Sequence, residues 1–544
     1  MTLQVRHHCE PVGKDKIIAY FFGVIGVSCI VFTLFGSWLK DFNPDILYVD
    51  KETLDVKRSG RYAVLVTKRP REINVNDEDE NIYINGTDYD TRNNSKKAVE
   101  GRSLVPNYTI ETDALSDQHD RKIKSTDAIL QHKLNPQKYV YESKDTSYQF
   151  VIPRTKVQDM FMNNKRRNTD GPCNELFENN VKALIDTTLH MNPTNRMKLD
   201  NNAYRKMTQN CSEYKNIRQY INSPLTQIET YFPLAYSIVA YKRVEQIERL
   251  LRAIYRPQNH YCIHMDSKSA TDDIETIQLI VSCFSNVHMS SRSVAVKWGT
   301  FSVLEAELVC MSDMWNKTWR YFINLTGQEF PLKTNLEIVK ILTAMKEANL
   351  VDGTWVRARE NYLYRWTKNI QPPPHNIRPI KGSVHIAVNR DFVDFALHDP
   401  RSKDFLQWLN LTDIPDETFF SSLNHNPHLQ IPGSFLGEPE EYPKKPTFTR
   451  YKNWEIGHGT WVRRCAGKYV RNVCILGVGD LFKLKDDISL FANKFYLDFQ
   501  YLAYECLEEL IYNRTRDQYL KELPIDVSFY EALDQVRYQL VKNN

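Results

Sequence analysis

A strand–helix–strand pattern between residues 231 and 266 constrains the fold of this chain more than any other feature. Two apolar runs of strand length, 235–240 and 260–265, flank a segment with helical periodicity. The apolar residues of that segment are Val244, Ile247, Leu250, Leu251 and Ile254. This order of elements predicts a βαβ unit with parallel strands and a right-handed crossover.

The second apolar run is followed directly by a carboxylate, Asp266. Open α/β sheets bind their ligands at the carboxyl ends of the strands, so Asp266 indicates a nucleotide-binding site. The alternative is a surface carboxylate at the strand end of any α/β domain. The pattern alone does not separate the two.

The alternation of elements continues after Asp266. The sequence predicts a helix over 274–284, a strand over 287–290, a long helix over 300–315 and a buried strand over 319–325. Alternating elements of this kind favour an α/β fold, with the sheet layered between helices.

The charge balance excludes one class of partner. The 544 residues include 71 Lys and Arg against 67 Asp and Glu, a formal net charge of +4. Nucleic-acid binding needs a concentrated basic face, so we expect no nucleic-acid partner.

The N-terminal segment has the features of a membrane anchor. Residues 17–39 contain no charged side chain and as a helix would reach about 35 Å, enough to cross a bilayer. Arg6, Lys14 and Lys16 precede them, and no small-residue cleavage site follows. This predicts a cytoplasmic tail over 1–16, with everything after Lys40 luminal or outside the cell. The alternative is a removed signal peptide.

Cysteine usage agrees with a luminal location. Cys9 and Cys29 lie in the predicted tail and membrane segment. An even number of cysteines remains, which suits four disulfides with 105 possible pairings, although buried free thiols are an alternative. These eight are Cys173, Cys211, Cys262, Cys283, Cys310, Cys465, Cys474 and Cys506.

Asn-x-Ser/Thr sequons also suit a luminal chain, and we expect only some of them to carry glycans. They occur at Asn85, Asn93, Asn107, Asn210, Asn316, Asn324, Asn410 and Asn513. The first five are the predicted glycosylation sites.

Composition divides the luminal part into three regions. Residues 40–170 are polar and lack sustained periodicity, which predicts a largely disordered stem. Residues 171–230, with a helical pattern over 175–189, are expected to pack on the main domain as an ordered extension. Residues 231–544 hold recurring apolar runs and form the predicted catalytic domain.

Several segments of the last region occur in one order that is far more specific than any single motif. They are PLAYSIVAYKRVEQIERLLRAIYRPQNHYCIHMD, SCFSNV, INLTGQEFPLKTNLEIV, PDETFF, VRNVCILGVGDL and LFANKF. With them the chain resembles the core 2 beta-1,6-N-acetylglucosaminyltransferases, the mucin-type branching enzymes of glycosyltransferase family 14. The resemblance implies a GT-A type nucleotide-sugar transferase domain, a Rossmann-like mixed sheet between helices, behind a transmembrane helix and stem.

The cysteine positions also match this family. The resemblance implies the disulfides Cys173–Cys506, Cys211–Cys283, Cys262–Cys310 and Cys465–Cys474. The family has a further cysteine where this chain has Thr326.

A nucleotide-sugar transferase must stabilise the departing diphosphate, and many GT-A enzymes hold a divalent metal with Asp-x-Asp. No Asp-x-Asp occurs from residue 231 to the C-terminus, and those in the predicted stem are interpreted as solvated charge runs. The resemblance places Arg471 and Lys494 at the diphosphate, where two cations would balance the charge of one metal ion. No metal cofactor is therefore expected. The alternative is two surface basic residues.

Glu417 in PDETFF matches the catalytic carboxylate of the family. Pro415 indicates a helix start with Asp416 and Glu417 in its first turn, so the alternative role for both acids is capping. One base without a second carboxylate suits direct displacement with inversion, whereas glycosidases need two carboxylates.

Substrate recognition is implied by the resemblance. Val239, Tyr241 and Asp266 would contact the uridine part of UDP, and Trp298 would meet the uracil ring. From the residues alone, Trp298 could equally be a core residue and Asp266 could cap a turn.

For the acceptor, Trp454 aligns with a family tryptophan, while Arg359, Glu360 and Arg365 are placed loosely. The family tyrosine two residues after that tryptophan is Ile456 here.

These features predict a Golgi type II membrane enzyme. It would transfer N-acetylglucosamine from UDP-N-acetylglucosamine to the GalNAc of core 1 O-glycans on glycoproteins. Alternatives are UDP-glucose as donor, an I-branching enzyme or xylosyltransferase-type relative, and, in another class, an inactive glycan-binding protein.

Overall fold

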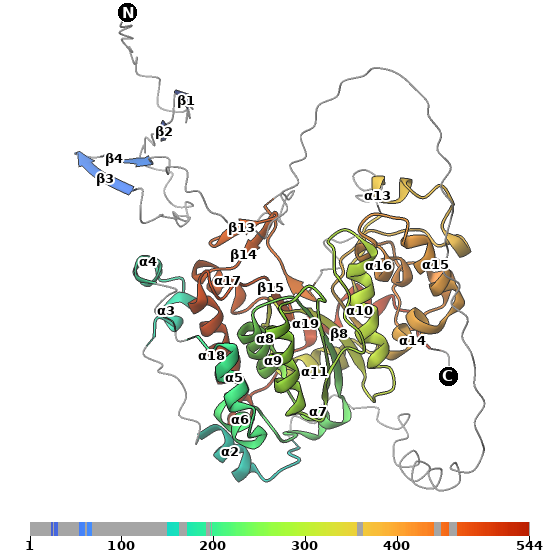
Figure 1. Ribbon diagram of the computed structural model, residues 1–544, viewed down its shortest axis with the longest axis horizontal. Helices are drawn as coiled ribbons and strands as arrows, with labels where there is room; N and C mark the ends of the chain where they lie inside the picture. Colours follow the sequence, from blue (N-terminus) through green and yellow to red (C-terminus); the bar gives the residue numbers. More distant parts are fainter. Residues whose placement is uncertain are drawn as a thin grey trace, which may run out of the picture. The chain divides into compact units, whose positions relative to one another are not determined.

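The computed structural model describes residues 149–162, 171–191, 196, 198–355, 363–439, 448–455 and 465–542, together with four short strands near the N-terminus (Figure 1). By internal contacts the chain divides into two compact units, one formed by 1–39 with 49–145 and the other by 40–48 with 146–544.

The N-terminal unit contains an antiparallel sheet of order β1-β2-β4-β3. Its strands are β1 (Gly23–Val24), β2 (Val27–Ile30), β3 (Leu54–Ser59) and β4 (Tyr62–Thr67). The sequence predicts a spanning helix over 17–39, but the described residues there are the strands β1 and β2, and β-branched residues such as those of β2 favour strands. Among the described residues, no helix combines the length and apolarity needed to cross a membrane. The rest of the predicted anchor and most of the predicted stem lie outside the described residues.

The main unit is built on a six-stranded mixed sheet of order β10-β11-β8-β5-β6-β7. β5 pairs in parallel with both β6 and β8, so the predicted βαβ unit is confirmed, and β11 runs antiparallel to β8. The strands are β5 (Leu234–Ala240), β6 (His260–Met265), β7 (Val287–Met289), β8 (Tyr321–Thr326), β10 (Leu350–Val351) and β11 (Ile386–Asn389).

Helices cover both faces of this sheet. Successive residues of a strand point to opposite faces, so the buried residues of β5 belong to two different core clusters. Tyr236 and Ile238 belong to one core cluster with α8 (Val244–Ile254), α9 (Thr271–Ser282) and α11 (Asn335–Ala344). Ala235 belongs to the other cluster, with α10 (Phe301–Asp313) and α14 (Arg390–His398) (Figure 1). The result is the predicted mixed α/β architecture, a sheet between two helical layers.

The strand order creates a switch point beside β5. The chain leaves β5 toward β6 and β7 and then returns to place β8 on the other flank of β5. Gly327, directly after β8, donates its N–H to the carbonyl of Val239 at 3.0 Å, and a Cβ on Gly327 would lie 3.1 Å from that of Ala240. The carboxyl ends of β5 and β8 therefore form the edge where open α/β sheets bind ligands.

Two smaller sheets carry residues toward this edge. β12 (Arg450–Tyr451), β15 (Phe491–Asn493) and β9 (Glu329–Pro331) form one, and the hairpin of β13 (Lys468–Val470) and β14 (Val473–Ile475) forms the other. The remaining elements are α2 (Arg154–Met162), α3 (Cys173–Phe177), α4 (Val181–His190), α5 (Asn201–Met207), α6 (Cys211–Ile217), α7 (Gln227–Tyr231), α13 (Tyr364–Thr367), η3 (Pro374–Asn376), α15 (Pro400–Leu409), η4 (Pro415–Glu417), α16 (Phe419–Asn424), η5 (Pro427–Leu429), η7 (Val478–Asp480), α17 (Leu481–Leu484), α18 (Tyr501–Lys521), α19 (Ser528–Glu531) and α20 (Asp534–Arg537).

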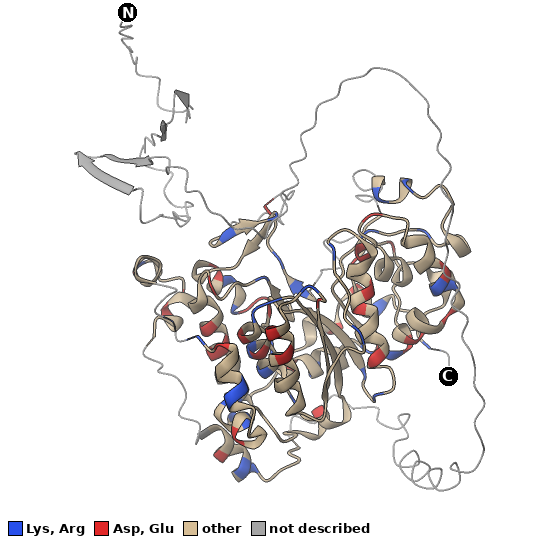
Figure 2. Ribbon diagram, viewed as in Figure 1, with Lys and Arg blue, Asp and Glu red and all other residues tan. Residues whose placement is uncertain are grey.

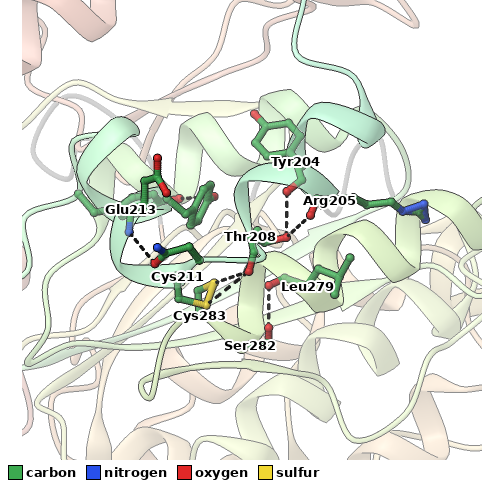
Figure 3. The surroundings of a disulfide bond; sticks show 11 residues. Tyr204, Arg205, Thr208, Cys211, Glu213, Leu279, Ser282 and Cys283 are labelled. Carbon is green, nitrogen blue, oxygen red and sulfur yellow. Dashed lines mark hydrogen bonds between the residues drawn. A yellow bond between two sulfur atoms is a disulfide. The ribbon is translucent and has the colours of Figure 1, made fainter.

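Four disulfides tie these elements together, and they are the four pairs that the family resemblance implies. Cys211 at the start of α6 joins Cys283 at the end of α9 beside Thr208, whose hydroxyl donates to the carbonyl of Tyr204 at 2.8 Å (Figure 3). This bridge fastens α6 of the N-terminal extension to α9, which packs beside β7.

Two expectations for the N-terminal extension are wrong in detail. The helix predicted over 175–189 is broken into α3 and α4, because Asn179 adopts a left-handed backbone with φ 56° and Asn180 caps α4. The predicted stem also ends earlier than residue 170: Val157 and Phe161 on α2 are buried against Tyr519 of α18 and its neighbours.

Candidate active site

Glu417 ends the short 3-10 helix η4, whose first residue is Pro415 as the sequence indicates. The carbonyl of Glu417 accepts a hydrogen bond from the N–H of Gly382 at 2.7 Å. A Cβ on Gly382 would lie 1.8 Å from the Ser421 hydroxyl oxygen and 2.4 Å from the carbonyl oxygen of Asp352. Only glycine allows this approach, which fixes the backbone of Glu417.

Two cations from distant segments hold the Glu417 carboxylate. Arg365 of α13 donates to its Oε2 at 2.7 Å, and the ammonium of Lys381 lies 3.7 Å from the same oxygen. Burial would raise the pKa of Glu417, but Lys381 and Arg365 outweigh it and lower that pKa. The side chain keeps 23% of its surface exposed, so the structure offers an ionised, accessible carboxylate.

Asp416 differs sharply from its neighbour. Burial and the charge of Glu417 raise the pKa of Asp416 to about 7, and its side chain is 7% exposed. Adjacent carboxyl groups with opposite pKa shifts are suited to different roles, and of these two the Glu417 carboxylate is the one that is ionised well below neutral pH.

Lys452 interacts electrostatically with the Glu417 carboxylate and lies near the predicted acceptor tryptophan. Its ammonium is 5.7 Å from the ring centre of Trp454, which is 42% exposed and bridges to Val473 of β14. Burial lowers the pKa of Lys452, partly offset by the charges of Glu417 and Asp352. Trp454 therefore shares its surroundings with the candidate base.

The structure brings the two predicted diphosphate cations together. Arg471 and Asn472, with φ 53° and 62°, form the two-residue turn between β13 and β14. Lys494 directly follows β15. Burial, then the charges of Arg471, Arg243 and Lys452, lower the pKa of Lys494, so each of these three cations acts on the Lys494 ammonium. Figure 2 shows basic segments around β13, β14 and β15.

The predicted uridine residues follow β5 and β6. Val239 is in β5, and Tyr241, which is 46% exposed, comes directly after it. Asp266 is buried and accepts hydrogen bonds from the N–H groups of Lys268 at 2.8 Å and Val296 at 3.2 Å.

These hydrogen bonds cap the turn after β6, which is the alternative role predicted for Asp266. They also hold the Asp266 side chain in place at the carboxyl end of β6. Trp298 is 75% exposed, so it is not a core residue. Its ring is accessible to a nucleobase such as uracil.

Several predicted residues lie elsewhere. Arg359 and Glu360 are outside the described residues, as are the sequons Asn85, Asn93 and Asn107. Asn316 is exposed, and the side chain of Asn210 caps α6 by accepting from the N–H of Glu213 at 3.2 Å.

The sequon at Asn324 is unsuitable for a glycan in the folded chain. Asn324 is 1% exposed, and its side chain bonds to the backbone of Val384 and Ile386.

One group in the described part of the chain has metal-ligand proximity. Ligand atoms of Cys465, Cys474 and Asp480 lie within 4.8 Å of one another. The two sulfurs form a disulfide, and the Asp480 carboxylate accepts from the N–H groups of Ala466 and Gly477. Without thiolates this cluster is structural.

Sequence reasoning missed Lys381, Lys452 and Arg243. Lys452 is two residues before Trp454, and Arg243 lies between β5 and α8. Both stand close in the sequence to predicted site residues, and this proximity could have identified them. Lys381 has no such signal, because its proximity to Glu417 arises from the tertiary fold alone.

Comparisons with known proteins identify the family of this chain. The family model described as "Core-2/I-Branching enzyme" matches residues 234–485. The N-acetyllactosaminide beta-1,6-N-acetylglucosaminyl-transferase of Mus musculus is 38% identical over 344 residues, covering 59% of this chain and 82% of that protein. The beta-1,3-galactosyl-O-glycosyl-glycoprotein beta-1,6-N-acetylglucosaminyltransferase of Homo sapiens is 33% identical over 379 residues, covering 65% and 87%. The chain belongs to the Core-2/I-branching enzyme family.

Proposed function

We propose that this chain is a beta-1,6-N-acetylglucosaminyltransferase with a GT-A type domain. It transfers N-acetylglucosamine from UDP-N-acetylglucosamine to the GalNAc of core 1 O-glycans on glycoproteins. The observation that carries this proposal is the ionised carboxylate of Glu417, held by Arg365 and Lys381 in a site that also gathers Arg471 and Lys494. A binding protein has no need of such a base.

The proposed reaction is a single displacement with inversion. Glu417 takes the proton from the 6-hydroxyl of GalNAc as that oxygen attacks C1 of the donor sugar. The bond from C1 to the β-phosphate oxygen breaks, and UDP leaves with the electron pair of that bond. Arg471 and Lys494 offset the negative charge that develops on the diphosphate, so no divalent metal is required.

The setting of the enzyme is also a proposal. A signal anchor over 17–39 would hold the catalytic domain in the Golgi lumen as a single-pass type II membrane protein. The four disulfides of the described structure suit an oxidising compartment of that kind.

A second acceptor, N-acetyllactosamine, is favoured by one observation. The relative named for N-acetyllactosaminide is 38% identical to this chain, against 33% for the human relative named for the O-glycosyl-glycoprotein. Transfer to core 1 and to lactosamine acceptors, each from UDP-N-acetylglucosamine and from UDP-glucose with EDTA present, distinguishes the options. A requirement for added Mn²⁺ would contradict the metal-free mechanism.

The assignment of the base is tested by Glu417→Gln. The amide keeps the shape of the side chain but cannot accept the proton, so we expect turnover to fall by about a hundredfold or more. UDP affinity should be retained, because Glu417 is not among the residues proposed to bind the nucleotide. Both are measured on the same preparation, by radiolabel transfer and by calorimetric titration with UDP. Turnover equal to that of the wild type would remove Glu417 from the mechanism.

A further inference from the structure

Arg243 has no role in the mechanism above, yet it lies at the edge where the nucleotide is expected. It comes three residues after the end of β5 and is the N-cap residue of α8, in a left-handed backbone with φ 73°. The N-terminus of α8, which is 11 residues long, adds a positive helix pole to the guanidinium. Both lie at the switch-point edge of the sheet.

Two residues from the segment after β15 hold the Arg243 side chain. Its guanidinium lies 4.5 Å from the ring centre of Tyr496, and its Nη2 donates to the Asp498 carboxylate at 2.9 Å. The ammonium of Lys494 lies 5.5 Å from the ring centre of the same tyrosine. Tyr496 is thus shared by two cations from different parts of the fold, which keeps them close to one another.

The charge of this group is poorly compensated. Arg243, Arg471 and Lys452 all disfavour the charged form of Lys494. Within the described residues, neither Lys494 nor Arg471 forms an ion pair with a carboxylate, and the Asp498 carboxylate pairs with Arg243. Cations assembled in a partly buried site against their mutual repulsion indicate an anionic ligand.

We propose that Arg243 is a third diphosphate-binding residue of the donor site, with Tyr496 and Asp498 positioning its guanidinium beside Lys494. This inference rests on the proposed function, because the anion it names is the diphosphate of UDP. Asp498 accepts from one terminal nitrogen of the guanidinium, and the remaining N–H groups of the planar fork can donate to phosphate oxygens.

The test compares Arg243→Asn with the wild-type chain by calorimetric titration with UDP, UMP and uridine. Asparagine tolerates a left-handed backbone and is a favoured N-cap residue, so the substitution removes the charge while preserving the start of α8. We expect UDP to bind about tenfold more weakly, UMP to lose less affinity and uridine none, because only the phosphates lose a charge-assisted contact. Arg243→Lys, which keeps the charge, should restore most of the UDP affinity.

A second readout is the pH dependence of UDP binding. Lys494 must be protonated to bind phosphate, and Arg243 is one of the charges that lower its pKa. Removing Arg243 raises that pKa, so in Arg243→Asn the loss of UDP affinity at alkaline pH should begin at a higher pH. If Arg243 had a purely structural role, its removal would not shift the alkaline loss of UDP affinity to a higher pH.

The matched control is Arg401→Asn. Arg401 also pairs with an aspartate, Asp399 at 2.8 Å, and lies 4.9 Å from the ring centre of Phe395, but on the α14–α15 segment. The Arg401→Asn substitution should leave the affinities for UDP, UMP and uridine unchanged.

Equal UDP affinity in Arg243→Asn and the wild type, or an equal loss for uridine and UDP, would overturn the role of Arg243. Failure of the wild-type chain to bind UDP would overturn the proposed donor, and the inference with it.

Discussion

The Glu417 carboxylate illustrates how single residues set the chemistry of this site. Burial alone would raise the pKa of Glu417, and the two cations Lys381 and Arg365 reverse that effect. The Glu417 carboxylate is therefore ionised because of residues 36 and 52 positions away in the sequence, not because of its own segment.

Replacing Arg365 by Gln should move the acid limb of the pH–rate profile. The nearby positive charge of Arg365 lowers the pKa of Glu417, so removing that charge raises the pKa of Glu417. A base must be deprotonated, and kcat at saturating acceptor should therefore begin to fall at a higher pH on acidification. The profile is measured from pH 4 to 8 beside the Arg401→Gln variant. An unshifted acid limb would show that Arg365 does not tune the base.

At this scale the sequence allowed only part of the site to be predicted. Glu417, Arg471 and Lys494 stand in segments that match a family, so the sequence alone could nominate them as site residues. Arg365 was expected to contact the acceptor, and its pairing with Glu417 could not be foreseen, because that contact joins side chains 52 residues apart. Lys381 was missed for the same reason.

At the scale of elements, local periodicity predicted a strand or helix best where the apolar pattern of one continuous segment is enough to define it. The strands at 235–240 and 260–265 and the helix between them agree with β5, β6 and α8 within one or two residues. Prediction failed where a single backbone conformation decides the outcome. The apolar spacing of 175–189 continues across Asn179, whose left-handed φ breaks the helix, and asparagine adopts that conformation in only some contexts.

The packing of α10 on β5 contains a buried carboxyl group that should make stability depend on pH. Ser237 of β5 donates its hydroxyl to Glu307 of α10 at 2.7 Å, and burial raises the pKa of Glu307 from 4.5 to about 8. Between these two pH values the unfolded chain loses this proton and the folded chain keeps it. The free energy of unfolding should therefore fall by about 1.4 kcal/mol per pH unit as pH rises through that window.

Glu307→Gln should remove this contribution, because an amide does not titrate and can still accept from Ser237. We expect the variant to gain stability relative to the wild type as pH rises from 5 to 8. Urea unfolding at both pH values measures the difference in free energy. Parallel pH dependence in the two proteins would mean that Glu307 is ionised in the folded chain.

For the molecule as a whole, the four disulfides and the separate apolar clusters define what holds the catalytic unit together. Cys173–Cys506 joins α3 to α18 across 333 residues, so the N-terminal extension is tied to the last long helix. A further apolar cluster includes Tyr519 of α18. In this cluster Val157 and Phe161 of α2 pack with Leu225, Leu336 and Tyr519. Composition assigned α2 to a disordered stem, because this short helix follows a long polar region and its packing partners lie far away in the sequence.

A fragment that begins at residue 149 should therefore be more stable than one that begins at residue 171. Val157 is 0% and Phe161 3% exposed, and burying such side chains contributes about 1.5–3 kcal/mol each. Without α2, Tyr519 and Leu336 also lose part of their cover, which lowers the melting temperature further. The matched control keeps the long fragment and replaces Val157 and Phe161 by Ala, and it should melt close to the short one. Equal melting temperatures for the two unsubstituted fragments would mean that α2 does not stabilise the catalytic unit.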